Sequence, residues 1–166
     1  FIFSRFTFNA AVSNIIIDGV TLRYYGTAFS STDNIVLRNI ESVGSGISIG
    51  GSSTNIQLLN CSIHDGMPGT SGQYGGGLGV TASTGATITN CTVEKFWNNV
   101  QMDSNVNTRF DRFISRDCPN HGFDGNLIRS LTVTNTIFLR CQDFFYLRGG
   151  QGVTVISKSG VQSTVP

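Results

Sequence analysis

The fold is indicated by the stretch NIQLLNCSI, residues 55–63, and by a similar stretch, GATITNCTV, residues 85–93. Both copies carry apolar side chains at their second and fourth positions, and both continue with Asn-Cys and a hydroxyl residue. An apolar side chain at every second position is typical of a strand that buries one face. The two stretches therefore predict equivalent strands in a repeating fold.

Similar stretches recur along most of the chain. They start near residues 14, 34, 55, 85, 107, 130 and 152, which gives seven repeats of about 22 residues. A second short strand recurs later in the repeat, for example as GISI (46–49) and HGFD (121–124). The one long interval holds the Gly-rich stretch MPGTSGQYGGG, residues 67–77, which is predicted to be an inserted loop. Short strands with no helical period between them predict an all-β solenoid and argue against a βαβ fold.

These repeats resemble the right-handed parallel β-helix of the pectate-lyase superfamily over about residues 14–157. The stretch GISIGGSSTNIQLLNCSI, residues 46–63, is similar to one turn of that fold. The resemblance implies a single β-helix domain over residues 1–166. Seven rungs spaced about 4.8 Å apart are short for such an enzyme, and no capping helix is predicted at either end. The chain is therefore expected to be part of a longer one or of an oligomer.

Two of the repeats contain Asn-Cys-Ser/Thr, which is a glycosylation acceptor in secreted proteins. The acceptors would be Asn60 and Asn90, which share the sixth repeat position with Asn39 and Asn135. Stacked asparagines that hydrogen-bond from rung to rung are typical of parallel β-helices, as in other stacked strands. We therefore expect a structural column at this position and no attached sugar.

The four cysteines fall into two columns. Cys61 and Cys91 follow the asparagines at a position predicted to point inward. Cys118 and Cys141 each lie 11 residues after the start of their repeat. Rungs about 4.8 Å apart put parallel Cβ atoms slightly beyond disulfide range, so buried thiols are expected in preference to a disulfide. The spacings match no zinc motif, and neither a metal nor another cofactor is predicted.

Composition narrows the classes of partner. Charged residues make up 13% of the chain and the formal net charge is +1, so the basic surface that nucleic acid or an anionic membrane requires is missing from the sequence. No apolar run of 18 residues predicts a membrane span. No signal peptide is visible in this sequence. The resemblance extends to phage tailspikes, which implies an extracellular or virion-surface location and a homotrimer, or contact with neighbouring β-helix segments of the same chain.

Because the interior of a β-helix is packed with side chains, a ligand must use an outward column or a loop. One outward surface lies at the tenth and eleventh repeat positions, where charges of opposite sign alternate. Its charged members include His64, Glu94 and Arg116, then Asp65, Lys95, Asp117 and Arg140. These residues are predicted to form a solvated ladder of ion pairs, each of which contributes little to stability.

The second outward surface is the outer face of the strand that contains GISI. Its first column is Ser48, Gln101, Asp124 and Tyr146, and its second is Gly50, Asp103, Asn126 and Arg148. Trp97 and His121 precede this strand, and Tyr74 lies in the Gly-rich stretch. Flat rings stack on pyranoses, and polar side chains hydrogen-bond hydroxyls or pair with uronates. A polysaccharide is therefore the predicted partner, with binding residues Trp97, Gln101, Asn126, Tyr146, Arg148 and Tyr74.

Three residues of this surface are candidates for catalysis. Asp103 and Asp124 lie on adjacent rungs with an offset of two residues, a diagonal of about 7–8 Å. Their carboxylates then span the separation that inverting glycosidases use. His121 is expected within reach of Asp124, and a histidine suits the general base that removes a sugar proton. The alternative is that all three are strand-end or turn residues without a catalytic role.

The stretch RDCPNHGFDGN, residues 116–126, is similar to rungs of phage tailspikes and to the Gly-Phe-Asp rung of alginate epimerases. In the epimerases the aspartate of that rung is catalytic, which implies this role for Asp124. The Pro-His that follows in the epimerases is Gly125-Asn126 in this chain, and the motifs of the pectin hydrolases and pectate lyases are absent from the sequence. Three functions stay open: a polysaccharide lyase, hydrolase or epimerase; a polysaccharide-binding module; or a structural segment of a fibre or adhesin.

Overall fold

The computed structural model describes residues 2–3, 7–9, 12–24, 26–66 and 76–156. These residues form a right-handed parallel β-helix of strands and turns, with no helix in the described segments. The predicted fold class is thus confirmed. Within the same segments there is no helix of the length and apolar character needed to cross a membrane.

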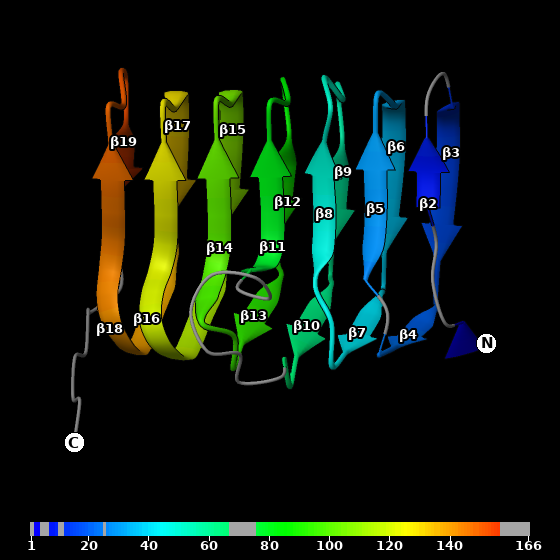
Figure 1. Ribbon diagram of the computed structural model, residues 1–166, viewed down its shortest axis with the longest axis horizontal. Coiled ribbons are helices and arrows are strands. Elements are labelled where there is room, and N and C mark those ends of the chain that lie inside the picture. The colour runs from blue at the N-terminus through cyan, green and yellow to red at the C-terminus, as the bar shows by residue number, and fades with distance from the viewer. Residues whose placement is uncertain (1, 4–6, 10–11, 25, 67–75, 157–166) are drawn as a thin grey trace.

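The coil has three faces, which can be followed in Figure 1. The first face holds β1 (Ile2–Phe3), β4 (Thr21–Arg23), β7 (Glu41–Val43), β10 (Ser62–His64) and β13 (Thr92–Glu94). The second face holds β2 (Thr7–Asn9), β5 (Thr27–Ser30), β8 (Ile47–Gly50), β11 (Gly76–Thr81) and β14 (Asn98–Asp103). The third face is a separate seven-stranded sheet of β3 (Ser13–Asp18), β6 (Asp33–Arg38), β9 (Gln57–Leu59), β12 (Thr87–Thr89), β15 (Val106–Asp111), β17 (Arg129–Thr134) and β19 (Thr154–Ile156).

Two long strands join the first and second faces. β16 (Ile114–Asn126) and β18 (Ile137–Arg148) each run through both faces without a break. In the preceding rung the same path is divided into β13 and β14. The first and second faces therefore belong to one continuous sheet, and Figure 1 shows β16 and β18 curving from one face into the other.

The register of the second face confirms the two predicted outward columns. In the first column, Gln101 pairs with Asp124, and Asp124 pairs with Tyr146. In the second column the paired residues are Thr81, Asp103, Asn126 and Arg148. Successive side chains of a strand point to opposite faces, so both columns lie on the outside of the coil. Polar and aromatic residues that are far apart in sequence are thereby brought together over β14, β16 and β18.

The Gly-rich stretch is placed only in part. Its residues 67–75, which include Tyr74, lie outside the described residues. Gly76 and Gly77, which end the stretch that was expected to be a loop, begin β11, and Gly76 pairs with Asn98 on the second face. The reason is close packing at this point, because a Cβ on Gly77 would lie 2.4 Å from Val93 Cγ1 and 2.7 Å from Phe96 Cδ2. Glycine at position 77 therefore serves the strand and its packing against the first face.

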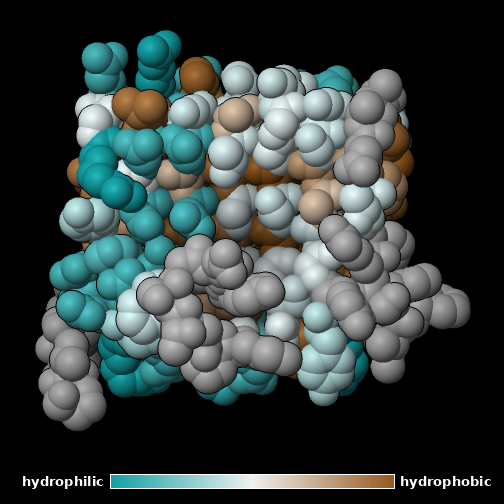
Figure 2. All heavy atoms as spheres, in the orientation of Figure 1, coloured by the Kyte–Doolittle hydropathy of each residue, from teal (hydrophilic) through white to brown (hydrophobic). Residues whose placement is uncertain are grey.

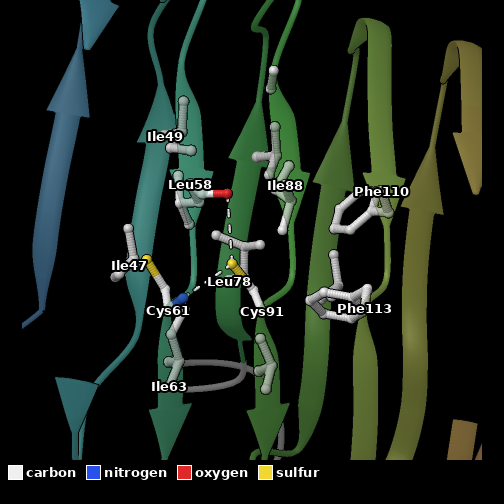
Figure 3. Close-up of a cluster of buried hydrophobic side chains, with 14 of the residues drawn as sticks. Ile47, Ile49, Leu58, Cys61, Ile63, Leu78, Ile88, Cys91, Phe110 and Phe113 are labelled. Carbon is white, nitrogen blue, oxygen red and sulfur yellow. Dashed lines mark hydrogen bonds between the residues drawn. The ribbon is translucent and has the colours of Figure 1, made fainter. Parts of the chain in front are cut away.

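The core is a stack of inward side chains along the axis of the coil. Its middle rungs are aliphatic, and Figure 3 shows Ile47, Leu58, Leu78 and Ile88 meeting inside the coil. Towards the C-terminal rungs the core becomes aromatic. Phe123 lies at its centre, with ring centroids 4.7–5.6 Å from those of Phe110, Phe113, Phe138 and Phe145. Edge-to-face and tilted rings at these separations attract one another in addition to the burial that they share.

The asparagine column turns out as predicted. Asn39, Asn60, Asn90 and Asn135 all have φ between 51° and 54°, the left-handed conformation that asparagine tolerates better than most residues. Asn60 Nδ2 donates to Asn39 Oδ1 at 3.4 Å, and Asn90 Nδ2 donates to Asn60 Oδ1 at 2.8 Å. The side-chain nitrogens of Asn60 and Asn90 are thus used between rungs. The triplets that resemble glycosylation acceptors serve to turn the chain.

We expect Asn60→Asp to lower the free energy of unfolding by about 1 kcal/mol, because it replaces a donor with a carboxylate oxygen that faces the acceptor Asn39 Oδ1. Chemical denaturation checks this value. Asn107→Asp is the matched control, since Asn107 has a similar φ of 55° but no side-chain hydrogen bond among the described residues. Equal loss of stability in the two variants would contradict the ladder interpretation.

The cysteines divide into one disulfide and two free thiols. Cys118 and Cys141 form a disulfide, so the expectation of stacked thiols at these positions was wrong. That expectation treated the Cβ atoms as parallel, whereas the 4.6 Å between the two Cα atoms already falls within the range that bridged cysteines have. Cys61 and Cys91 are buried and free, as predicted.

The two free cysteines are buried members of the core and contact each other. The Cys61 backbone N–H donates to Cys91 Sγ at 3.3 Å, and Cys91 Sγ donates to the Leu58 carbonyl at 3.6 Å (Figure 3). The hydrogen bond with Cys61, followed by burial, raises the pKa of the Cys91 thiol. Cys91 therefore stays protonated and is a poor nucleophile at neutral pH.

Candidate functional site

The candidate site lies on the second face, where β14, β16 and β18 run side by side (Figure 1). Asp124 is at its centre. Its side chain is only 12% exposed, and both of its oxygens are engaged. Asn98 Nδ2 donates to one oxygen and an Arg148 guanidinium nitrogen donates to the other, each at 3.1 Å. A carboxylate has room for about four hydrogen bonds, so each oxygen keeps capacity for one more donor.

A flat aromatic stack stands beside this carboxylate. The rings of His121 and Tyr146 are almost parallel, with an angle of 7° between their planes and 4.6 Å between their centroids. The Arg148 guanidinium carbon lies 5.1 Å from the centre of the Tyr146 ring, a cation–π arrangement. Tyr146 is 45% exposed, so the outer side of the stack faces solvent.

Asn98 connects the ring stack of His121 and Tyr146 with the Asp124 carboxylate through hydrogen bonds. It is 7% exposed, and its Oδ1 accepts hydrogen bonds from Asn120 Nδ2 at 2.8 Å and from the His121 backbone N–H at 3.3 Å. Asn98, Asn120, His121, Asp124, Tyr146 and Arg148 thus form one connected group, the polar network. Because Asn98 is buried and held by three hydrogen bonds, it fixes the orientation of Asp124 before any ligand arrives.

His121 lies in the network but not in the position that was expected. Its Nδ1 is 3.1 Å from Asp143 Oδ2, although the alignment is not that of a hydrogen bond. Its ring face is covered by Tyr146. Asp124 is bonded to Asn98 and Arg148, and no direct bond joins its carboxylate to the His121 side chain among the described contacts.

The second predicted carboxylate, Asp103, is placed at the edge of the same surface. It pairs with Asn126 in the strand register, and its Oδ1 accepts hydrogen bonds from Asn126 Nδ2 at 3.3 Å and Ser104 Oγ at 3.0 Å. Gln101 is exposed in the column of Asp124. The predicted set of Gln101, Asp103, Asp124, Asn126, Tyr146 and Arg148 is therefore brought together on one surface.

Trp97 belongs to a neighbouring pocket. This pocket has a volume of about 390 Å³ and is lined by Asp65, Gly66, Lys95, Phe96, Trp97, Asp117 and Pro119. Trp97 directly precedes Asn98, and Pro119 directly precedes Asn120. The pocket therefore adjoins the polar network through two chain connections. Tyr74, the remaining predicted binding residue, lies outside the described residues.

The predicted ladder of ion pairs borders this pocket. Lys95 Nζ is 2.7 Å from Asp65 Oδ1, an Arg140 guanidinium nitrogen is 2.8 Å from Asp117 Oδ2, and Arg116 pairs with Glu94. The Lys95 ammonium holds the pKa of the Asp65 carboxyl below its ordinary value, and Arg140 does the same for the pKa of Asp117. Both carboxyls are consequently charged at neutral pH.

Sequence patterns did not single out Asn120 or Asp143, and they placed Asn98 just before the strand without counting it among the binding residues. The period-two pattern assigns side chains within straight strands, but Asn98 starts β14 and Asn120 lies within the curved part of β16. The strand register also shifts between Cys118 and His121, which changes where the following side chains point. No signal in the sequence would have predicted these contacts.

The described residues do not gather His, Cys, Asp and Glu side chains in groups of three or more that could hold a metal ion. Figure 2 shows hydrophilic residues concentrated over the C-terminal rungs, where β16 and β18 lie, while the central rungs of the same view are paler. The contacts on this surface include hydrogen bonds, an ion pair and a ring stack.

Comparison with known proteins supports the fold. Residues 2–165 match the family model described as a right-handed β-helix region. Among solved structures, the chain is similar to a protein from Parabacteroides merdae ATCC 43184 described as a "putative glycosyl hydrolase". That similarity has a TM-score of 0.59 and 12% sequence identity, and it covers 96% of this chain and 84% of the other, which shows the fold alone. The curated proteins compared include no match. The chain thus belongs to the family of proteins with a right-handed β-helix region.

Proposed function

We propose that the chain binds a polysaccharide across the second face, over β14, β16 and β18. The observation that carries this proposal is the exposed Tyr146 ring, stacked on His121 beside the fixed pair of Asp124 and Arg148. A pyranose presents a flat apolar side that packs on an aromatic ring, and its hydroxyls donate to carboxylates and accept from guanidinium groups. All of these partners are provided within one connected network.

A carbohydrate ligand is consistent with the shared fold of the structural neighbour described as a "putative glycosyl hydrolase". The disulfide between Cys118 and Cys141 favours an oxidising compartment. We therefore place the proposed interaction outside the reducing cytosol, with an extracellular or virion-surface location as the specific proposal.

The hydrogen bonds that Asp103 and Asp124 accept favour binding over hydrolysis. An inverting glycosidase needs one acid that donates a proton and one base that activates water. Both oxygens of Asp124 accept hydrogen bonds from N–H donors, and Asp103 Oδ1 accepts two hydrogen bonds. These contacts hold both carboxylates as hydrogen-bond acceptors within the surface, which is the role that binding of sugar hydroxyls requires.

Cleavage remains a second candidate, supported by one observation. His121 has Asp143 3.1 Å from its Nδ1, and a base that is oriented by a third group is a recurrent catalytic arrangement. In this candidate, His121 abstracts a sugar proton, while Asp124 and Asp103 hold the substrate. The reaction class is then elimination or epimerisation of a uronic acid unit.

The test is retention of the chain on a panel of immobilised neutral and acidic polysaccharides. Tyr146→Ala should weaken binding about tenfold, because loss of one stacking contact of roughly 1.4 kcal/mol corresponds to that factor. Tyr24→Ala is the matched control, since Tyr24 is 64% exposed on an early rung and lies outside the polar network. Equal retention of the two variants, or no retention of the wild type, would rule the proposal out.

The same panel separates binding from cleavage. Bound polysaccharides are incubated with the chain, and new reducing ends and the ultraviolet absorbance of unsaturated sugars are followed. Product that disappears in His121→Ala and in Asp124→Asn would establish the second candidate. Retention without product would leave binding as the activity.

A further inference from the structure

The pocket around Trp97 has the size and shape of a small-ligand site. Its volume of about 390 Å³ falls within the range of roughly 300–1,000 Å³ that such sites occupy. Phe96 is 3% exposed and contributes a buried aromatic wall, and Trp97 is half-buried beside it. A Cβ added to Gly66 would lie 2.2 Å from Phe96 Cδ1, so the glycine brings the backbone directly onto that ring. Rings and backbone thus form a compact apolar surface.

The charges that line the pocket favour an uncharged ligand. Asp65 and Asp117 contribute two carboxylates, and Lys95 contributes one ammonium group. Lys95 is already paired with Asp65 at 2.7 Å, which leaves it poorly available to an incoming anion. Asp117 is likewise paired with Arg140, at 2.8 Å, so the described lining residues present no unpaired cation to an incoming carboxylate. A uronate would therefore find no free cationic partner among the lining residues, whereas a hydroxyl group can donate to either carboxylate.

The pocket is also continuous with the proposed polysaccharide surface. Trp97 lines the pocket, and the next residue, Asn98, donates a hydrogen bond to Asp124. Pro119 also lines the pocket, and the next residue, Asn120, donates a hydrogen bond to Asn98. One sugar chain can therefore contact both regions when it lies along β14 and β16. The aromatic stack of His121 and Tyr146 would hold one unit, and the pocket would hold another.

We propose that the Trp97 pocket is a specificity site that receives an uncharged pyranose unit of the bound polysaccharide. This inference rests on the proposed function. Trp97 provides the stacking ring, Phe96 and Pro119 close the apolar wall, and Asp65 and Asp117 accept hydrogen bonds from sugar hydroxyls. The pocket thereby selects polymers that carry a neutral unit at this place and discriminates against polymers made only of uronic acids.

The chain contains a single tryptophan, so its fluorescence reports directly on this pocket. The full chain is titrated with neutral oligosaccharides of the cello, xylo and manno series and with oligogalacturonates of matched length. We expect a saturable change in Trp97 fluorescence with at least one neutral series and none with oligogalacturonates. Tyr146→Ala should keep the response to the shortest binding neutral oligosaccharide, because the pocket is intact in that variant.

A second measurement uses polysaccharide retention. Trp97→Ala should weaken binding of a polymer with neutral units about tenfold, and Asp117→Asn should weaken it less and admit oligogalacturonates. Glu94→Gln, which alters the adjacent ion pair of Arg116 outside the pocket lining, serves as the control and should bind as the wild type does.

The outcomes distinguish this inference from the proposed function. If polysaccharide is retained in a Tyr146-dependent manner but Trp97 fluorescence and Trp97→Ala affinity do not change, the pocket inference is wrong and the proposed function stands. A fluorescence response of equal size to oligogalacturonates overturns the assigned sugar class. If no glycan is retained or changes the fluorescence, both proposals are wrong.

Discussion

The Phe123→Ala variant is expected to lose about 3–5 kcal/mol of unfolding free energy, the largest effect of any single substitution that we propose. Phe123 is fully buried, and its ring contacts four other phenylalanine rings at centroid distances of 4.7–5.6 Å. Alanine would leave a cavity that these rings cannot fill, because the backbone of β15, of β18 and of the turn before β16 holds them in place. The penultimate and last rungs would lose most of their shared core.

The measurement is equilibrium denaturation followed by circular dichroism. Leu127→Ala is the control, since Leu127 is 55% exposed only four residues away, and a surface change of this kind costs within about 0.5 kcal/mol. Because each rung of a solenoid contacts mainly its neighbours, hydrogen exchange in Phe123→Ala should rise in β16 and β18 before it rises in β6 and β9. A loss below 1 kcal/mol would show that the aromatic cluster does not hold these rungs together.

Removal of the disulfide has the second-largest expected effect. Cys118 and Cys141 are separated by 23 residues, and a bridge that closes a loop of this length stabilises the folded state by roughly 3 kcal/mol in the chain-entropy model. The Cys118→Ala/Cys141→Ala double variant should therefore be less stable by about that amount. Cys118 also lies between Asp117 and Pro119, which line the Trp97 pocket, so its loss should weaken ligand binding as well.

Reductant provides the matched control for this prediction. Wild-type stability should fall when the protein is denatured in the presence of a thiol reductant, whereas the stability of the double variant should not change. Thiol titration of the denatured wild type should find two free cysteines, in agreement with Cys61 and Cys91. Four free thiols in protein purified without reductant would refute the disulfide.

The repeats were predictable because equivalent positions in successive rungs have the same backbone conformation and the same side-chain orientation. Alternation placed Ile56 and Leu58 inside, and the asparagine column appeared at a turn where φ is positive in every copy. The two outward columns of the second face follow from the register of the repeats, which correctly predicts Asp124 and Tyr146 as neighbours.

The contacts within the candidate site were not predictable in the same way. They depend on Asn98 and Asn120, which lie where the chain bends, and on rotamers that a repeat pattern does not encode. His121 illustrates the difference. Its rung was assigned correctly, but its ring packs on Tyr146 and approaches Asp143, which the pattern did not indicate. The disulfide was missed because side-chain rotation, not rung spacing, decides whether two stacked cysteines can join.

Hydroxyl-radical footprinting in the presence of a retained polysaccharide is the direct test of whether the sugar chain binds over the second face. The proposed arrangement predicts that Tyr146, which is 45% exposed, becomes protected from oxidation, because the sugar chain covers the outer face of its ring. It also predicts that Tyr24 and Ile16, which are 64% and 62% exposed outside the polar network, keep their reactivity. Protection of Tyr24 and Ile16 with no change at Tyr146 would contradict the placement of the polysaccharide on the second face.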